Sequence, residues 1–169
     1  DRANSIITEF LSLAKDKNVE LASNNLNITI ANIYPLLQAD AIGAGKTIVL
    51  ELENIPNILM NENEMRQYIL NLVHNGLDAI KYKGTVGIKT YMDEQSVVLK
   101  IQDDGEGIPQ EILDKLGTPF VTTKDKGTGL GIPICYRIAD RHKAEMEIES
   151  NSTGTNFLIK FSPILEMSK

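Results

Sequence analysis

The sequence has a single cysteine, no tryptophan and no apolar run close to the ~20 residues that a membrane-spanning helix needs. A single cysteine excludes an internal disulfide and a cysteine-based metal site, and it favours a reducing compartment. Because Cys135 lies in an apolar stretch, we interpret it as a buried structural thiol. We therefore expect a cytoplasmic fragment without membrane contact, although the parent protein could still be anchored in a membrane.

An excess of positive charge is also absent. The chain carries 23 Asp and Glu residues against 17 Lys and Arg residues, a formal net charge of −6. Broad non-specific binding to nucleic acid needs a positive field, so we expect no nucleic-acid partner. An anionic ligand must then be held by local groups. With 169 residues, 42% of them hydrophobic, the chain is long enough for one domain with its own core.

The stretch AIGAGKTIVL, residues 41–50, contains a Gly-Lys-Thr sequence like the end of a phosphate-binding P-loop. The full P-loop pattern needs a glycine where this chain has Asp40. The stretch also follows a helical pattern and precedes a strand, which reverses the order around a P-loop. We therefore expect Gly43 and Gly45 to end a helix and form a turn, and Lys46 to be a solvated charge at a strand start.

Hydrophobic periodicity separates a leading helix, within residues 1–20, from a domain over residues 26–166. The apolar positions of the leading helix have three-and-four spacing: Ala3, Ile6, Ile7, Phe10, Leu13 and Ala14. A short amphipathic helix needs a packing partner, and we interpret this one as a piece of a helical bundle. Packing of the helix against its own domain stays open as the alternative. Residues 18–27 are expected to be a polar connector.

The rest of the chain alternates between helical and strand-like patterns. Helical spacing covers residues 28–45, 61–81 and 132–143, and strand-like patterns cover residues 47–54, 85–92, 96–102, 144–150 and 155–161. Pro35 is expected to kink the first helix, because an interior proline costs ~3 kcal/mol. This order predicts an α+β fold, a two-layer sandwich whose mixed, mainly antiparallel sheet is covered by about three helices.

Three polar or glycine-rich motifs stand out: NLVHN in the long helix, DDGEGIP at a strand end, and KGTGLGIP at a helix start. In the last motif, glycines without Cβ atoms precede free helix N–H groups, an arrangement that favours a phosphate. Its spacing is not that of a dinucleotide-binding fold. Each motif alone is weak, since Gly105 and Gly107 could simply be turn residues.

Taken together, these motifs resemble the Bergerat-fold ATPases, and most closely the catalytic, ATP-binding domain of bacterial sensor histidine kinases. NLVHNGLDAI resembles the N box, DDGEGIP the first glycine box, PFVTTKDKGTGLGI the F box running into the second glycine box, and GTNFLIKF the closing Gly-Thr element. The match covers about residues 26–162 in family order. The opening helix is similar to the second helix of the dimerisation and phosphotransfer hairpin of sporulation-type kinases, so residues 1–20 would be its remnant.

The resemblance implies ATP and Mg²⁺ as ligands. Asp103 would accept the adenine amino hydrogen with support from Thr155, and Asn75 would ligate Mg²⁺. Hydrolytic relatives, such as gyrase, heat-shock chaperone and mismatch-repair ATPases, carry a water-activating Glu at the position of Asn71. A neutral amide cannot be a general base, a role that typically contributes ~10²–10⁴-fold, so slow hydrolysis and transfer to another acceptor are expected.

The tract between Gly107 and Gly127 is implied to be a lid over the nucleotide, docked by Phe120. Lys124 or Lys126 could reach the phosphates or could be solvated. The implied catalytic residues are Asn71, Asn75 and Lys124. The implied nucleotide-binding residues are Asn75, Asp103, Gly105, Gly107, Ile108, Phe120, Lys124, Lys126, Gly127, Thr128, Gly129, Leu130, Gly131 and Thr155.

The N box departs from the family pattern. Asp78 and Ala79 stand where many histidine kinases have a basic and an aromatic residue that touch the nucleotide. Lys81, Tyr82 or Lys83 are candidates to replace those contacts.

Neither histidine has the neighbours of a phosphoacceptor, so we expect the acceptor on a hairpin helix absent from this chain. We interpret His74 as a helix-face residue near the nucleotide and His142 as a last-turn residue favourable to the helix dipole.

The resemblance implies a kinase module that phosphorylates this hairpin histidine, from which a response-regulator aspartate takes the phosphoryl group. The hairpin implies a homodimer in the full-length protein. A hydrolysing Bergerat ATPase and a nucleotide-binding scaffold without phosphotransfer stay open as alternatives. An anti-sigma-type serine kinase shares the asparagine N box but does not need the leading helix.

Overall fold

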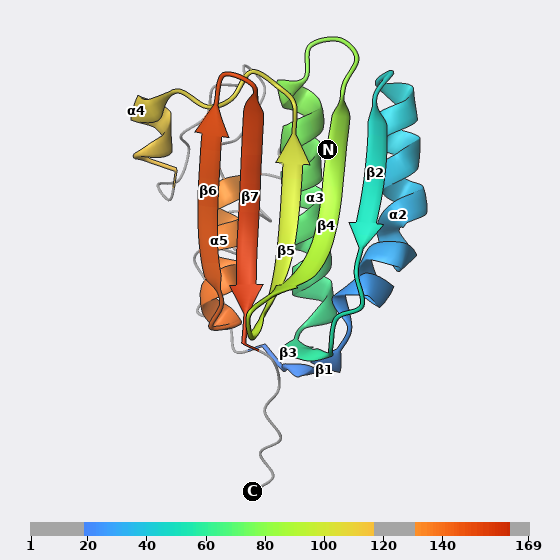
Figure 1. Cartoon of the computed structure of the whole chain (residues 1–169), viewed down its shortest axis with the longest axis vertical. Helices are drawn as coiled ribbons and strands as arrows, with labels where there is room; N and C mark the ends of the chain where they lie inside the picture. Colours follow the sequence, from blue (N-terminus) through green and yellow to red (C-terminus); the bar gives the residue numbers. More distant parts are fainter. Residues whose placement is uncertain (1–18, 117–130, 163–169) are drawn as a thin grey trace, which may run out of the picture.

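The computed structural model describes residues 19–116 and 131–162, which form two layers, a sheet with helices on one face (Figure 1). The elements are β1 (Ala22–Asn24), α2 (Leu26–Gly43), β2 (Thr47–Leu52), β3 (Ile58–Met60), α3 (Glu62–Ala79), β4 (Thr85–Asp93), β5 (Ser96–Asp103), α4 (Gln110–Leu113), α5 (Gly131–Arg141), β6 (Glu145–Asn151) and β7 (Gly154–Phe161). The predicted α+β fold is confirmed.

Five strands make a mixed sheet in the order β2-β4-β5-β7-β6. β2 runs parallel to β4, and the other neighbouring pairs are antiparallel. α2, α3 and α5 all lie on the same face of this sheet (Figure 1). The core lies between these two layers, where the largest fully buried side chains include Tyr68, Leu72, Ile88 and Leu99.

The helix α3 shows why the sequence pattern predicted this layer so well. Asn61 caps its N-terminus, because the side-chain oxygen accepts from the Glu64 N–H at 2.9 Å. Met65 and Ile69, at helical spacing, are fully buried, as the predicted apolar face requires. α3 is therefore fixed at its start by a cap and along its length by burial.

The first predicted helix is a single element in the structure, and the kink expected at Pro35 stays a prediction. α2 spans 18 residues with Pro35 inside it. It ends at Gly43, and Gly45 follows with φ of 73°, in the left-handed region that favours glycine. The expected helix stop and turn before β2 are thus confirmed.

The prediction for Lys46 is wrong, because this residue is not simply a solvated charge. It is partly buried, and its Nζ donates to the main-chain oxygen of Leu77, in the last turn of α3. A cation at a helix C-terminus is favourable, because carbonyl oxygens there lack partners within the helix. Lys46 therefore joins the start of β2 to the end of α3.

The predicted polar connector at residues 18–27 is also partly wrong. Its residues Ala22–Asn24 form β1, which pairs antiparallel with β3. Both strands have three residues, too few for an alternating pattern to be visible in the sequence. The short helix α4 escaped prediction for the same reason.

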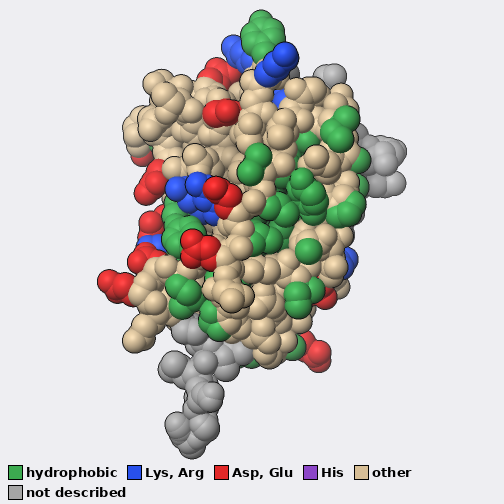
Figure 2. Space-filling model, turned by 45° about the vertical axis from the view of Figure 1, so that its right-hand side comes forward, with side chains coloured by type: hydrophobic (Ala, Val, Ile, Leu, Met, Phe, Trp, Pro, Cys, Tyr) green, Lys and Arg blue, Asp and Glu red, His purple; other side chains and the backbone are tan. Residues whose placement is uncertain are grey.

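Apolar side chains remain exposed on the outer side of α2. Ile28, Leu36 and Ile42 are 62%, 53% and 66% exposed, and Val49 on the neighbouring β2 is 43% exposed. Figure 2, which brings this side of the molecule forward, shows apolar side chains gathered on it. α2 is thus apolar on its buried and on its outer face, unlike the amphipathic α3.

Candidate nucleotide site

A row of three polar residues crosses the sheet at one end, on neighbouring strands. Asp103 on β5 pairs in register with Thr155 on β7, which pairs with Ser150 on β6. Asp103 and Thr155 are 7% and 3% exposed. Because side chains alternate between the faces of a strand, all three point to the helix-covered face, where Ile101 and Phe157 lie in the core. We call Asp103, Thr155 and Ser150 the polar row.

Short hydrogen bonds connect the members of the polar row to one another and to the loop after β5. The Ser150 and Thr155 hydroxyl oxygens are 2.8 Å apart. The Ile108 N–H donates to Ser150 Oγ at 2.8 Å, and the Gly105 N–H donates to Asp103 Oδ1 at 2.9 Å. The DDGEGIP loop is therefore held by the row at two points.

Burial raises the pKa of Asp103 above its ordinary value of 3.8. Hydrogen bonds from the main-chain N–H groups of Gly105 and Thr155 oppose the effect of burial and lower this pKa. The nearby Asp104 carboxylate raises it further. A carboxylate in such a position is costly to leave without donors. Asp103 is thus suited to accept a hydrogen bond from a ligand that fills the space beside it.

Close backbone approaches explain two glycines of this region. Gly107 has φ of 83°, and a Cβ added there would lie 1.9 Å from the main-chain oxygen of Asn151. A Cβ added at Gly76 of α3 would lie 3.2 Å from Asp103 Cβ. Side chains at these two positions would push the loop off the β6–β7 hairpin and the helix off Asp103.

Two asparagines of α3 lie over this end of the sheet, one helical turn apart. Asn71 and Asn75 are both half-buried. Asn71 Nδ2 donates to the main-chain oxygen of Gly131, the first residue of α5, at 3.4 Å. Gly76, the neighbour of Asn75, is the residue that packs on Asp103. The structure thus gathers the N-box motif, the loop after β5 and the start of α5 at one end of the molecule.

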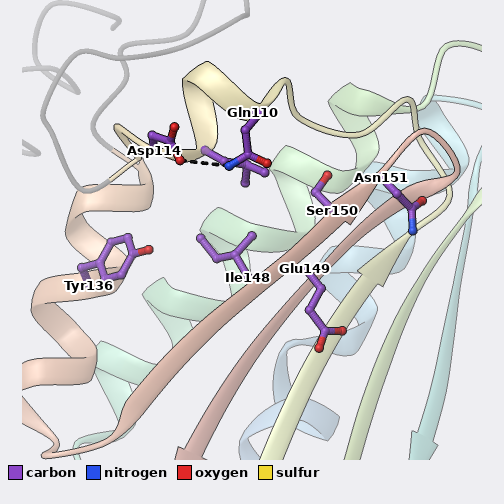
Figure 3. A pocket seen from close by; sticks show the side chains of 8 residues that line it. Gln110, Asp114, Tyr136, Ile148, Glu149, Ser150 and Asn151 are labelled. Atoms are coloured by element: carbon purple, nitrogen blue, oxygen red, sulfur yellow. Dashed lines mark hydrogen bonds between the residues drawn. The ribbon is translucent and has the colours of Figure 1, made fainter.

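A pocket of about 510 Å³ lies beside the polar row, between α4, α5 and β6 (Figure 3). Its lining comprises Gln110, Leu113, Asp114, Tyr136, Ile148, Glu149, Ser150 and Asn151. Ser150 belongs to both the pocket wall and the polar row. Sequence reasoning missed Ser150, although the short turn between the last two predicted strands already placed it near Thr155.

The sequence model for histidine kinase-, DNA gyrase B- and HSP90-like ATPases matches residues 60–164. This chain belongs to that ATPase family. Sporulation kinase C of Bacillus subtilis (strain 168) is 35% identical to it over 153 residues, which are 89% of this chain and 36% of the relative. The chain therefore spans about a third of that relative's length.

Solved structures of histidine kinases share the fold. The catalytic domain of histidine kinase ThkA, in a nucleotide-free form, matches with a TM-score of 0.77 at 28% identity, covering 85% of this chain and 96% of that one. ThkA in complex with the response regulator protein TrrA matches with a TM-score of 0.82 at 26% identity, covering 98% of this chain and 48% of that one. The resemblance to histidine kinase catalytic domains is thus confirmed.

Several residues that the ATPase family pattern implies fall outside the described part of the chain. These are Phe120, Lys124, Lys126, Gly127, Thr128, Gly129 and Leu130. The lid and the phosphate-binding glycines therefore stay predictions, and so does the leading helix of residues 1–18. Within the described residues, Asp103, Thr155, Gly105, Gly107, Ile108, Asn71, Asn75 and Gly131 come together at one end of the fold.

The candidates to replace the missing N-box contacts lie in the loop after α3. Lys81 Nζ is 3.6 Å from Glu106 Oε2 of the first glycine box. Tyr82 is 84% exposed. That Lys81, Tyr82 or Lys83 contacts the nucleotide stays a prediction.

His74 is an exposed residue on the face of α3, as interpreted from the sequence, and its closeness to the nucleotide stays a prediction. Its Nε2 lies 2.9 Å from Asp40 Oδ2 of α2, on the side of α3 that α2 covers. Its contact is thus with the neighbouring helix α2.

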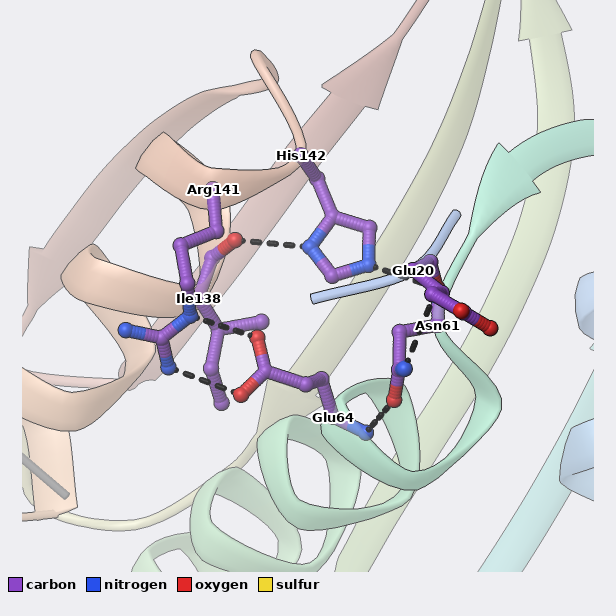
Figure 4. A network of polar contacts seen from close by, with 6 residues as sticks. All are labelled: Glu20, Asn61, Glu64, Ile138, Arg141 and His142. Atoms are coloured by element: carbon purple, nitrogen blue, oxygen red, sulfur yellow. Dashed lines mark hydrogen bonds and ion pairs between the residues drawn. The ribbon is translucent and has the colours of Figure 1, made fainter. Parts of the chain in front are cut away.

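The interpretation of His142 as a charge on the helix dipole is wrong. The residue is 6% exposed, its Nδ1 lies 2.8 Å from the Ile138 oxygen, and its Nε2 accepts from the Asn61 N–H at 3.0 Å (Figure 4). A neutral ring with its proton on Nδ1 satisfies both contacts. Burial lowers the pKa of His142, which keeps the ring neutral.

Residues 19–116 and 131–162 hold neither a candidate metal cluster nor a candidate membrane-spanning helix. No three His, Cys, Asp or Glu side chains there are grouped so that they could hold a metal ion. No helix in these ranges is both long and apolar enough to cross a membrane.

Proposed function

We propose that this chain is the ATP-binding catalytic domain of a two-component sensor histidine kinase. It transfers the γ-phosphoryl group of ATP to a histidine on the hairpin helix that this chain lacks. One observation carries the choice of kinase over hydrolase: the side chain over the start of α5 is Asn71, whose amide donates to the Gly131 oxygen. An amide cannot take a proton from water, so hydrolysis is slow and the phosphoryl group is kept for the histidine.

Adenine binding is assigned to the polar row. Asp103 accepts a hydrogen from the adenine amino group, and Thr155 supports this contact. The buried position of Asp103 makes it selective, since a base without a donor leaves a buried acceptor without its partner. Gly105, Gly107 and Ile108 shape the wall of the base site through the contacts that hold their loop.

Phosphate binding is assigned to the second glycine box and the lid. Gly127, Thr128, Gly129, Leu130 and Gly131 would surround the phosphates at the start of α5. Lys124, Lys126 and Phe120 would belong to the lid.

Asn75 would hold Mg²⁺ through its side-chain oxygen. A side-chain amide oxygen is a ligand type that Mg²⁺ accepts, and its other ligands would come from phosphates and water. When bound, Mg²⁺ would neutralise phosphate charge. Asn71 and Asn75 would orient the nucleotide that binds over the polar row.

The partners follow from the same assignment. ThkA forms a complex with a response regulator, which supports a response regulator as the eventual acceptor here. We assign residues 1–20 to the second hairpin helix, through which the full-length protein would form a homodimer, and residues 26–166 to the catalytic domain. Both ATP and a response regulator are cytoplasmic, so we place this domain in the cytoplasm.

The decisive experiment uses ATP labelled at the γ-phosphate. The chain is incubated with and without the histidine-bearing hairpin of its parent protein, and acid-labile label on the hairpin is compared with released phosphate. Label on the hairpin, and none with Asp103→Asn, is the expected result. Rapid phosphate release without the hairpin would show a hydrolase, and ATP binding with neither outcome would show a scaffold; either result contradicts the proposal.

A further inference from the structure

Ser150 is the member of the polar row to which the family resemblance assigns no role. It lies at the outer end of the row, partly buried, with its hydroxyl between two elements of the base site. The Ser150 hydroxyl oxygen accepts a hydrogen bond from the Ile108 N–H at 2.8 Å and lies 2.8 Å from Thr155 Oγ1. Its hydroxyl is thus in direct contact with the residue that supports Asp103.

The single hydrogen of the Ser150 hydroxyl has two acceptors within reach. Thr155 Oγ1 lies at 2.8 Å and the Gly154 oxygen at 3.4 Å. The bond between the two hydroxyls can run either way, but the reverse direction would leave the Ser150 hydrogen only the long contact to Gly154. An O–H···O bond is optimal near ~2.7–2.8 Å and weak beyond ~3.0 Å, so Thr155 is the better acceptor for this hydrogen. Ser150 then accepts from Ile108 and donates to Thr155.

This direction determines what Thr155 can do. A hydroxyl that accepts from Ser150 keeps its own hydrogen to donate. Beside it, ionised Asp103 can only accept. The polar row therefore presents a donor next to an acceptor, in that order across β7 and β5.

A donor at Thr155 beside an acceptor at Asp103 is complementary to adenine and not to guanine. Adenine presents an amino donor beside a ring-nitrogen acceptor, whereas guanine presents a carbonyl acceptor beside an N–H donor. Guanine would place its carbonyl oxygen against the Asp103 carboxylate, which repels it.

We propose that Ser150 is a specificity-determining residue that orients the Thr155 hydroxyl as a donor and so sets the preference for adenine over guanine nucleotides. Ser150 acts through Thr155 and is therefore a positioning residue. The inference rests on the proposed function, because it assumes that the base binds at the polar row. It adds a residue and a direction of hydrogen bonding to that site.

The test measures the dissociation constants of ATP and GTP by calorimetry for the chain and its Ser150→Ala variant. Loss of one oriented hydrogen bond should weaken ATP binding roughly fivefold to tenfold, while GTP binding changes less. Ser150→Thr, which keeps the hydroxyl, should restore the preference for ATP. Ser152→Ala, in the exposed turn between β6 and β7, is the matched control and should change neither constant.

A merely structural role for Ser150 would weaken both nucleotides by the same factor, and an unchanged ATP-to-GTP ratio would overturn the inference. If Ser150→Ala does not fold, Ser150→Cys carries the same test, because a thiol fills the same space but donates weakly. Failure of the proposed function looks different: the unaltered chain would then bind neither nucleotide, or transfer no phosphoryl group.

Discussion

The two ends of the α3 helix use buried polar groups in opposite ways. At the upper end in Figure 1, the polar row lies beside a pocket, and no basic side chain of the described residues pairs with Asp103. At the lower end, Glu64 and Arg141 form a two-point ion pair with both distances at 2.8 Å (Figure 4). Buried groups that satisfy one another stabilise the fold, whereas buried groups that keep bonding capacity bind ligands.

The lower end also shows how many elements one residue can join. Asn61 caps α3, donates its main-chain N–H to His142 after α5, and donates from Nδ2 to the Glu20 oxygen at 3.1 Å. This network connects the chain entering the domain to both α3 and α5 (Figure 4). We expect changes here to alter stability and changes at the upper end to alter nucleotide binding.

The largest expected effect is on stability, from Glu64→Ala. Glu64 and Arg141 have side-chain exposures of 6% and 10%, so removing one partner leaves a buried charge and should cost about 3–5 kcal/mol of unfolding free energy. Urea unfolding measures it. The matched control is Glu62→Ala, which removes the exposed pair with Arg66 and should cost about 0–1 kcal/mol. Similar losses in both variants would contradict the comparison.

The next largest effect is on binding, from Asp103→Asn. It replaces the acceptor of the polar row by an amide and should weaken ATP binding on the order of a hundredfold, without a loss of unfolding free energy at neutral pH. Calorimetric titration measures it. Lys46→Ala is the control, since Lys46 contacts Leu77 and is not assigned to the base site. Loss of ATP binding in Lys46→Ala would show that the site has been misplaced.

The two ends should also respond to pH with opposite signs. The pKa of His142 is lowered from 6.5, so its contribution to stability is complete above pH 6.5 and is lost as the pH falls through the folded-state pKa. The pKa of Asp103 is raised from 3.8, so its contribution is present below pH 3.8 and is lost as the pH rises through the folded-state pKa.

Urea unfolding across this pH range tests both signs. His142→Gln should flatten the fall in stability below pH 6.5. The free energy of unfolding of Asp103→Asn should rise relative to that of the unaltered chain as the pH rises. A fall that persists in His142→Gln would assign the pH response to other groups.

The smallest expected effect comes from Tyr68, midway along α3. Its hydroxyl is buried and has no hydrogen-bond partner among the described residues, and burial raises its pKa. Tyr68→Phe removes a polar atom that neither end uses, so the free energy of unfolding should stay the same or rise by up to about 1 kcal/mol. Thermal unfolding measures the change, and a clear loss of stability would reveal a partner for this hydroxyl.

Much of the fold could be predicted because its main patterns are local. The apolar face of α3 and the alternation along β4 and β5 appear within single segments of sequence. The motifs around Asn75 and Asp103 likewise identified the ATPase family, whose sequence model matches residues 60–164. β1, β3 and α4 were missed because three or four residues carry too little pattern.

The sequence by itself determined the longer helices and strands and the ATPase family to which the chain belongs. Tertiary structure alone decided the partners: Lys46 on the end of α3, Ser150 beside Thr155, and His142 against Asn61, a contact between residues 81 positions apart. The physical reason is that periodicity depends on neighbours along the chain. Burial, protonation and the direction of a hydrogen bond depend instead on groups that only folding brings together.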